Sequence, residues 1–156
     1  MAAMTDFFEN KLIDFLFRGQ ALGITGATAA AGTGPANLYI ALFTANPTDS
    51  AAGTEVTGGS YARVAITSSL ANWAGTQSAG STVASSGTGG TTSNNGAITF
   101  PAPTANWGVV TGMGIFDAAT AGNLLIYSAL TVNKTINNGD AAPSFAAGAA
   151  TFQIDN

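Results

Sequence analysis

Short runs of alternating apolar residues, separated by glycine and proline turns, occupy most of the chain after residue 36. A period of two is typical of β-strands, and it is clearest at residues 37–44, which Asn46-Pro47 ends, and at residues 124–130. Other short runs lie at 61–67, 97–100, 107–116 and 149–154. This pattern predicts a mainly β fold, an antiparallel β-sandwich with the jelly roll among its candidate topologies.

One helix is predicted near the N-terminus, between Thr5 and Gly19. Thr5 suits an N-cap, and Gly19 can adopt the left-handed conformation that ends a helix. Five of the chain's charged residues (4 basic and 8 acidic in all) lie on this segment, so we expect one edge of it to meet water. The helix is apolar on more than one side. Its apolar residues fill the chain's own core or, alternatively, contact another subunit, and the candidate contacts are Phe7, Phe8, Leu12, Phe15, Leu16 and Phe17.

Two segments have no periodicity. Residues 20–36 are a Gly/Ala/Thr linker, so the predicted organisation is a helix and linker arm (1–36) followed by a β-sandwich domain (37–156). Residues 75–96 are rich in Gly, Ser and Thr, which predicts a mobile surface loop or, alternatively, a contact with a neighbouring subunit.

The composition excludes several classes of function. Charged residues make up only 8% of the chain, and the four basic residues do not cluster, which argues against a nucleic-acid or anionic-membrane surface: Lys11, Arg18, Arg63 and Lys134. No apolar run is long enough to span a membrane. Because the chain has no His and no Cys, the usual hydrolase triads and zinc sites cannot be built. We therefore expect a protein that is not an enzyme and has no cofactor or metal.

Paired carboxylates are the one remaining route to acid–base catalysis. Asp49 and Glu55 share a loop and could approach each other, although solvated or turn-capping roles are favoured for all the acids outside the helix. No Asp-rich loop has the spacing of a calcium site. These acids are Asp49, Glu55, Asp117, Asp140 and Asp155.

Aromatic residues stand near or within the predicted strands. Filling of a core or an interface is the favoured role, and an exposed carbohydrate-binding face is the alternative. The residues concerned are Trp73, Trp107, Tyr39, Tyr61 and Tyr127.

Several segments, taken together in this order, resemble a family of small tailed-bacteriophage virion proteins that are often labelled tail-fibre-like: residues 17–19, 38–48, 55–63, 106–108, 114–125 and 134–140. The resemblance implies a virion structural component, assembled in the bacterial cytoplasm and released by lysis, and brings no catalytic residues. It agrees with the acidic start, since Asp6 and Glu9 stand where a secretory signal would be positively charged.

Three hypotheses follow. The first is a capsid-surface decoration (cement) protein that forms an oligomer, such as a trimer, and reaches the major capsid protein through residues 1–36. The second is a tail-fibre or baseplate subunit that contacts the host through exposed Trp and Tyr residues and the segment 75–96. The third is a secreted carbohydrate-binding module, against which the scarcity of acids and the missing signal argue.

Overall fold

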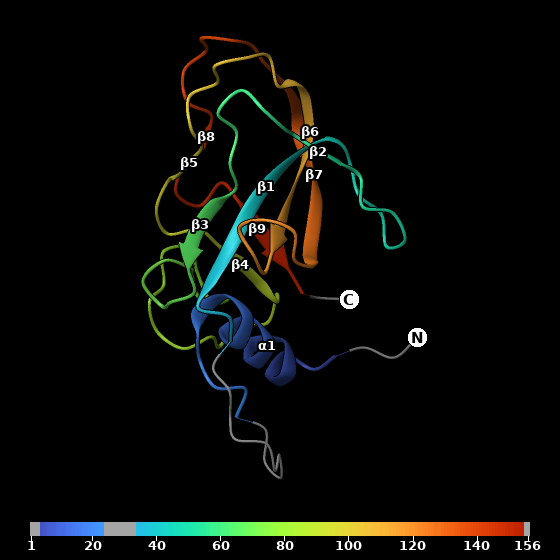
Figure 1. Ribbon diagram of the computed structural model, residues 1–156. Coiled ribbons are helices and arrows are strands. Elements are labelled where there is room, and N and C mark those ends of the chain that lie inside the picture. Colours follow the sequence, from blue (N-terminus) through green and yellow to red (C-terminus); the bar gives the residue numbers. More distant parts are fainter. Residues whose placement is uncertain (1–3, 24–33, 155–156) are drawn as a thin grey trace. The chain divides into compact units, whose positions relative to one another are not determined.

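The computed structural model describes residues 4–23 and 34–154, and its elements are antiparallel strands with one helix near the N-terminus (Figure 1). The predicted mainly β class is therefore confirmed, while the sandwich arrangement stays a prediction. In chain order the elements are α1 (Asp6–Arg18), β1 (Asn37–Ala45), β2 (Thr54–Glu55), β3 (Val64–Thr67), β4 (Thr91–Ser93), β5 (Ile98–Thr99), β6 (Gly108–Phe116), β7 (Leu124–Ile136), β8 (Ser144–Phe145) and β9 (Thr151–Gln153).

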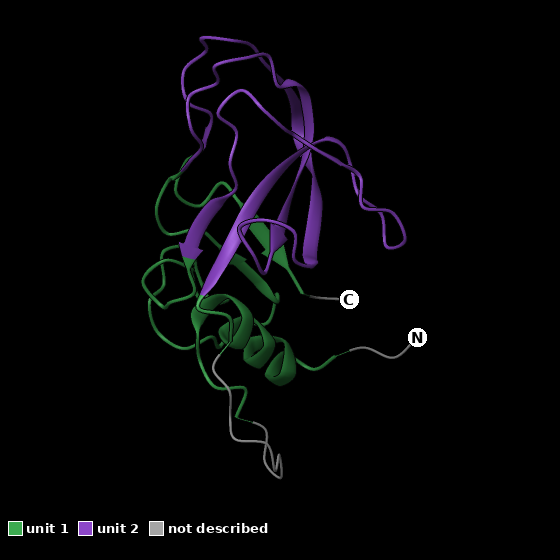
Figure 2. Ribbon diagram, in the orientation of Figure 1, with its two compact units in different colours: residues 1–36, 67–98, 145–156 green, residues 37–66, 99–144 purple. Residues whose placement is uncertain are grey.

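The chain divides into two compact units (Figure 2). Unit 1 comprises residues 1–36, 67–98 and 145–156, and unit 2 comprises residues 37–66 and 99–144. The predicted boundary after residue 36 falls where unit 2 begins. Unit 1, however, also contains residues 67–98 and 145–156, and no feature of the sequence predicts that these two segments group with the helix. Most of the predicted linker arm lies outside the described residues.

The ends of α1 follow from local chemistry, as predicted. The backbone N–H of Phe8 donates to the side chain of Thr5, which has an extended conformation (φ −93°, ψ 152°). Gly19 ends the helix at φ +66°, and the following N–H, of Gln20, donates to the carbonyl of Asp14 at 3.0 Å. A Cβ at Gly19 would lie 2.7 Å from the carbonyl oxygen of Ser68, so only glycine fits this end without rearrangement.

The core of unit 1 is aromatic and draws on three separate stretches of chain. Phe17 of α1 is fully buried, and its ring centroid lies 5.0 Å from that of Trp73 and 5.6 Å from that of Phe152 in β9. β9 pairs with β4, where Thr92 faces Phe152. Aromatic pairs of this kind contribute about 0.5–1.5 kcal/mol each beyond their buried area. These contacts fix which side of α1 turns inward.

The expectation that α1 meets water along one edge holds only in part, because Asp6 is exposed and Lys11 half-buried but the other three charged residues are buried. Asp14 is 5% exposed and Arg18 is 0% exposed, and they form an ion pair of 2.6 Å between Oδ1 and Nη1. Burial of both charges is tolerated because each has further partners. The Nε of Arg18 donates to the carbonyl of Trp73 at 3.1 Å, and Asp14 Oδ2 accepts the N–H of Ser85 at 2.9 Å.

The segment 75–96 closes over this ion pair. Besides its N–H, Ser85 donates its hydroxyl to Asp14 at 2.6 Å, and Asn10 of α1 donates to the carbonyl of Gly87 at 2.9 Å. The hydroxyl of Thr76 donates to Asn10 at 2.6 Å. A folded cover for α1 within the same chain is a third role for this segment, beside the mobile loop and the neighbour contact considered above.

Unit 2 is built around a five-stranded sheet with the order β2-β1-β6-β7, in which β3 also pairs with β1. β1 is buried on both faces, which explains its nearly continuous apolar sequence. It runs antiparallel to β6, with Ile40 opposite Ile115. A Cβ at Gly114 of β6 would lie 2.8 Å from the ring of Phe43. The glycine therefore lets the Phe43 ring pack against the β6 backbone, a close approach of the kind that a glycine inside a strand predicts.

Candidate functional site

Five of the six predicted contact residues on α1 keep exposed surface, which we call the outer side of the helix. Phe7 is 60% exposed, and the ammonium of Lys11 lies 5.9 Å from the centre of its ring. Phe8, Leu12, Phe15 and Leu16 are half-buried, so each keeps some surface. Phe17 is different, because it is fully buried in the aromatic core of unit 1. Five of the six predicted residues therefore retain surface for a contact.

The outer edge of the unit 2 sheet is a second apolar surface. β7 ends the strand order, so within residues 4–23 and 34–154 no strand lies along its outer edge. Residues 124–133 carry no charge and no proline. The pairing of β7 with β6 changes register, because Val110 lies opposite Lys134 whereas Gly112 lies opposite Ala129. The extra residues of β7 between these pairs form a bulge, in which Val132 is 77% exposed. An uncharged edge strand of this kind can accept another strand.

The acid of β2 has a structural role. Glu55 and Arg63 form a bidentate pair, with Nη2–Oε2 2.7 Å and Nε–Oε1 2.8 Å, and Tyr61 donates its hydroxyl to the same carboxylate. Arg63 also donates to the carbonyls of Ala118 and Ala121 and lies 3.4 Å from the centre of the Phe116 ring. Burial raises the pKa of the Tyr61 hydroxyl, and hydrogen bonding to Glu55 raises the pKa of Arg63. The group holds the 117–123 turn against β2.

The remaining loop acids also have local partners. Asp49 accepts a hydrogen bond of 2.6 Å from Tyr127, so it and Glu55 are engaged by different groups. Asp117 accepts both the backbone and the side-chain N–H groups of Asn123, and these bonds lower the pKa of its carboxyl. Asp140 accepts the N–H of Asn137, the turn-capping role predicted for it. Asp155 lies outside the described residues.

The two tryptophans are core residues, as favoured from the sequence. Trp73 is 0% and Trp107 5% exposed, so neither offers a platform for a receptor. Tyr39 and Tyr61 are half-buried, and Tyr127 is 38% exposed. The alternative of an exposed tryptophan face is therefore wrong.

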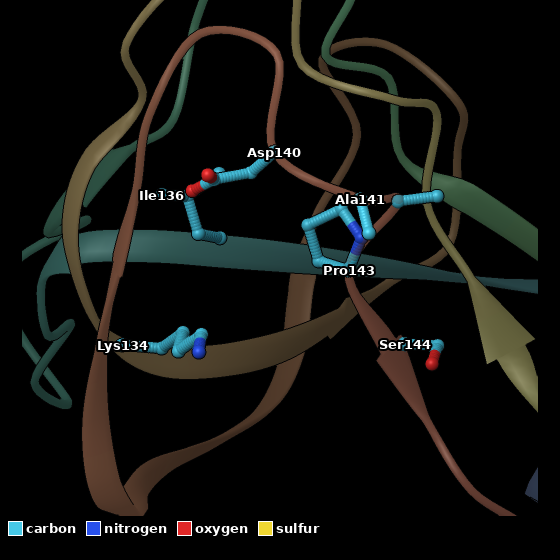
Figure 3. A pocket seen from close by; sticks show the side chains of 7 residues that line it. Lys134, Ile136, Asp140, Ala141, Pro143 and Ser144 are labelled. Atoms are coloured by element: carbon cyan, nitrogen blue, oxygen red, sulfur yellow. The ribbon is translucent and has the colours of Figure 1, made fainter.

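Unit 2 also contains a pocket of about 410 Å³, with both polar and apolar lining, between the end of β7 and the chain that leads into β8 (Figure 3). Its apolar lining includes Ile136 and Pro143, whose carbonyls accept the N–H groups of Trp107 and Phe100 and so fix the walls. Its polar lining is Lys134, Asp140 and Ser144. Sequence alone does not indicate Lys134 and Ser144 as pocket residues, because nothing local shows that the chain returns past β7 here.

A second pocket, of about 480 Å³, lies beside the Glu55–Arg63 pair. It is lined further by small residues, among them Gly58 and Ala119. Because Glu55 and Arg63 already satisfy each other and the adjacent carbonyls, this pocket offers a ligand little charge to bind. We regard the Lys134–Asp140 pocket as the better candidate for a ligand site.

The described residues contain no group of three or more acidic side chains placed to hold a metal ion. Nor does the described part of the chain contain a helix of the length and hydropathy needed to cross a membrane.

Comparison with known proteins agrees with the resemblance noted in the sequence. The family model described as podophage GP4 fiber I protein gp80 matches residues 3–153, which covers nearly the whole chain. No curated protein matches the chain. The chain therefore belongs to the family of the podophage GP4 fiber I protein gp80, and it is a structural component of a tailed-phage virion.

Proposed function

We propose that this chain is a subunit of a fibre on a tailed-phage particle and that its role is assembly and host contact. The observation that carries the proposal is the family match over residues 3–153, because the matched family is described as a fiber protein. That description favours a fibre over capsid decoration. Decoration of the shell as a cement protein, bound to the major capsid protein, is the alternative that an experiment must exclude.

We further propose that the chain is not an enzyme. The charged side chains of the described residues support this, because they are mostly engaged in holding turns and helices together. Glu55 is neutralised by Arg63, Asp14 by Arg18, and Asp117 closes its own hairpin. A general acid or base needs a proton-transfer partner in a substrate, and carboxylates committed to internal bonds are poorly placed for that.

Assembly would use the two exposed apolar surfaces, the outer side of α1 and the edge of β7. Apolar burial contributes roughly 25 cal/mol per Å² and depends little on salt, which suits a chain with few charges. We propose that α1 docks on another virion subunit and that β7 pairs with a second copy of the chain. A homo-oligomer formed this way covers the uncharged edge that a single copy leaves open. Neither surface favours nucleic acid or a membrane as partner.

The place of assembly follows from the proposed role. A fibre subunit is built into the particle in the bacterial cytoplasm and leaves the cell by lysis with the particle.

Particles assembled without the chain test the fibre proposal. We expect such particles to have filled, heat-stable heads but to lack a fibre in negative-stain micrographs and to adsorb poorly to host cells. Expression of the chain in the host should restore adsorption. Heads that lose their DNA on mild heating, with fibres and adsorption intact, would instead support the cement alternative.

Substitutions on the apolar surfaces test the assembly proposal. Phe7→Ser should reduce incorporation of the chain into particles, and Leu125→Lys should lower the oligomer mass measured by light scattering, because each places a polar group in a contact. Val83→Ser is the matched control, since Val83 is 65% exposed and belongs to neither α1 nor β7. Equal effects from all three variants would argue against these contacts.

A further inference from the structure

The pocket at the end of β7 is lined by a lysine, Lys134, that forms no ion pair within residues 4–23 and 34–154. Within the described residues, Arg18 and Arg63 are ion-paired, and the ammonium of Lys11 lies over the ring of Phe7. Lys134 has no ion pair and no side-chain hydrogen bond in the same part of the chain. In a chain with four basic residues, an unengaged lysine at the rim of a pocket is a distinctive feature.

A carboxylate lines the same pocket without pairing with this lysine. Asp140 accepts the N–H of Asn137 at 2.8 Å through Oδ2, which fixes the turn that carries it. Lys134 and Asp140 lie apart in Figure 3, and they form no ion pair within 4.0 Å. The pocket therefore presents a positive and a negative group that can each bind a different part of one ligand.

Apolar groups complete the lining. Ile136, Ala141 and Pro143 offer carbon surface, and Ser144 adds a hydroxyl. A volume of about 410 Å³ is within the usual range for small-molecule sites, which combine an apolar lining with a few polar groups.

These features define the chemistry of the ligand. A bare anion would be attracted by Lys134 but repelled by Asp140. A neutral sugar would leave the ammonium without a partner. A sugar that carries a carboxylate or phosphate can contact the lysine, the aspartate and the apolar lining at once. Its anionic group pairs with Lys134, its hydroxyls donate to Asp140, and its carbon face packs on the apolar lining.

We propose that this pocket binds one anionic sugar unit, with Lys134 holding the acidic group and Asp140 accepting hydroxyl hydrogens. The biological use of the site rests on the proposed fibre function, because a fibre that touches the host meets surface saccharides, but binding itself does not depend on it. The site is thus a candidate for the contact with the cell.

Binding to the purified full chain tests the proposal. Saturation-transfer NMR and calorimetry would compare galacturonic acid and galactose 6-phosphate with galactose, all at equal ionic strength. We expect at least one charged sugar to bind about ten-fold or more tightly than galactose, and added salt to weaken it. Lys134→Gln should weaken it by a similar factor and remove most of the preference over galactose. Asp140→Asn, which keeps an acceptor for the turn, should weaken all three sugars.

Lys11→Gln is the matched control, because it removes the other lysine and belongs to unit 1. It should leave binding unchanged, and circular dichroism would check that each variant is folded. Equal binding of charged and neutral sugars, no binding of either charged sugar, or an unchanged affinity in folded Lys134→Gln would overturn the proposal. Preferential binding of alanine, whose zwitterion offers both charges without hydroxyls, would overturn the assignment to a sugar.

These outcomes are separate from those of the fibre proposal. Loss of fibres without the chain, together with no sugar binding, would refute the pocket alone. Charged-sugar binding by a protein found on the head shell would refute the fibre role alone.

Discussion

Replacement of Asp14 by alanine should strongly destabilise unit 1. The change removes the partner of Arg18, whose guanidinium is fully buried, and it also removes the acceptor for the N–H and hydroxyl of Ser85. Removing one partner of a buried ion pair typically costs about 3–5 kcal/mol, because the other charge stays buried without compensation. Against a domain stability of about 5–15 kcal/mol, a loss of this size is large.

A double variant tests whether the unpaired Arg18 charge causes this loss of stability. Replacing Arg18 by methionine in the Asp14→Ala background removes the stranded charge, so the double variant should be more stable than Asp14→Ala alone. Urea unfolding followed by tryptophan fluorescence would measure the free energies, since Trp73 lies in the same core. Asp6→Ala is the control, because Asp6 is exposed in the first turn, and it should cost well under about 1 kcal/mol.

A loss of less than about 1 kcal/mol in Asp14→Ala would refute the view that the ion pair organises unit 1. So would a double variant whose loss is the simple sum of the two single losses, because that would show that the two charges do not interact.

Two further predictions concern single positions. Gly19→Ala should destabilise the protein by more than about 1 kcal/mol, because the left-handed conformation disfavours a Cβ and this one would lie 2.7 Å from Ser68; thermal melting would measure it, and Gly139→Ala, with open space around it, should cost less. The pKa of Asp117 is lowered in the folded state by its bonds to Asn123, so its stabilising effect is present above the unfolded pKa of about 4 and is lost as the pH falls through the folded pKa. The stability difference between the wild type and Asp117→Asn should therefore shrink in urea titrations below about pH 4, and a constant difference down to pH 2 would contradict this assignment.

The parts of the fold that sequence predicts are the local ones. The N-cap at Thr5, the end at Gly19 and the alternating strands of unit 2 each depend on a few neighbouring residues. Neighbouring residues do not determine which face of α1 is buried, because the helix has apolar residues on several sides. Its orientation is decided by Trp73, which is distant in sequence.

The same reason explains what the sequence missed elsewhere. Residues 75–96 lack apolar periodicity, and they are held by polar contacts such as that of Ser85 with Asp14, which no local pattern indicates. The pocket depends on Lys134 and Pro143 coming together as the chain returns past β7. The sequence does predict the turn at residues 137–140 that carries Asp140, but a turn alone does not indicate a pocket.

The location of the chain in the particle tests the central claim most directly. Gold labelling of a tagged, functional copy in intact virions, imaged by electron microscopy, would count and place the label. The fibre account predicts a small number of labels, all on fibres. Labels in large number over the whole head shell would contradict it.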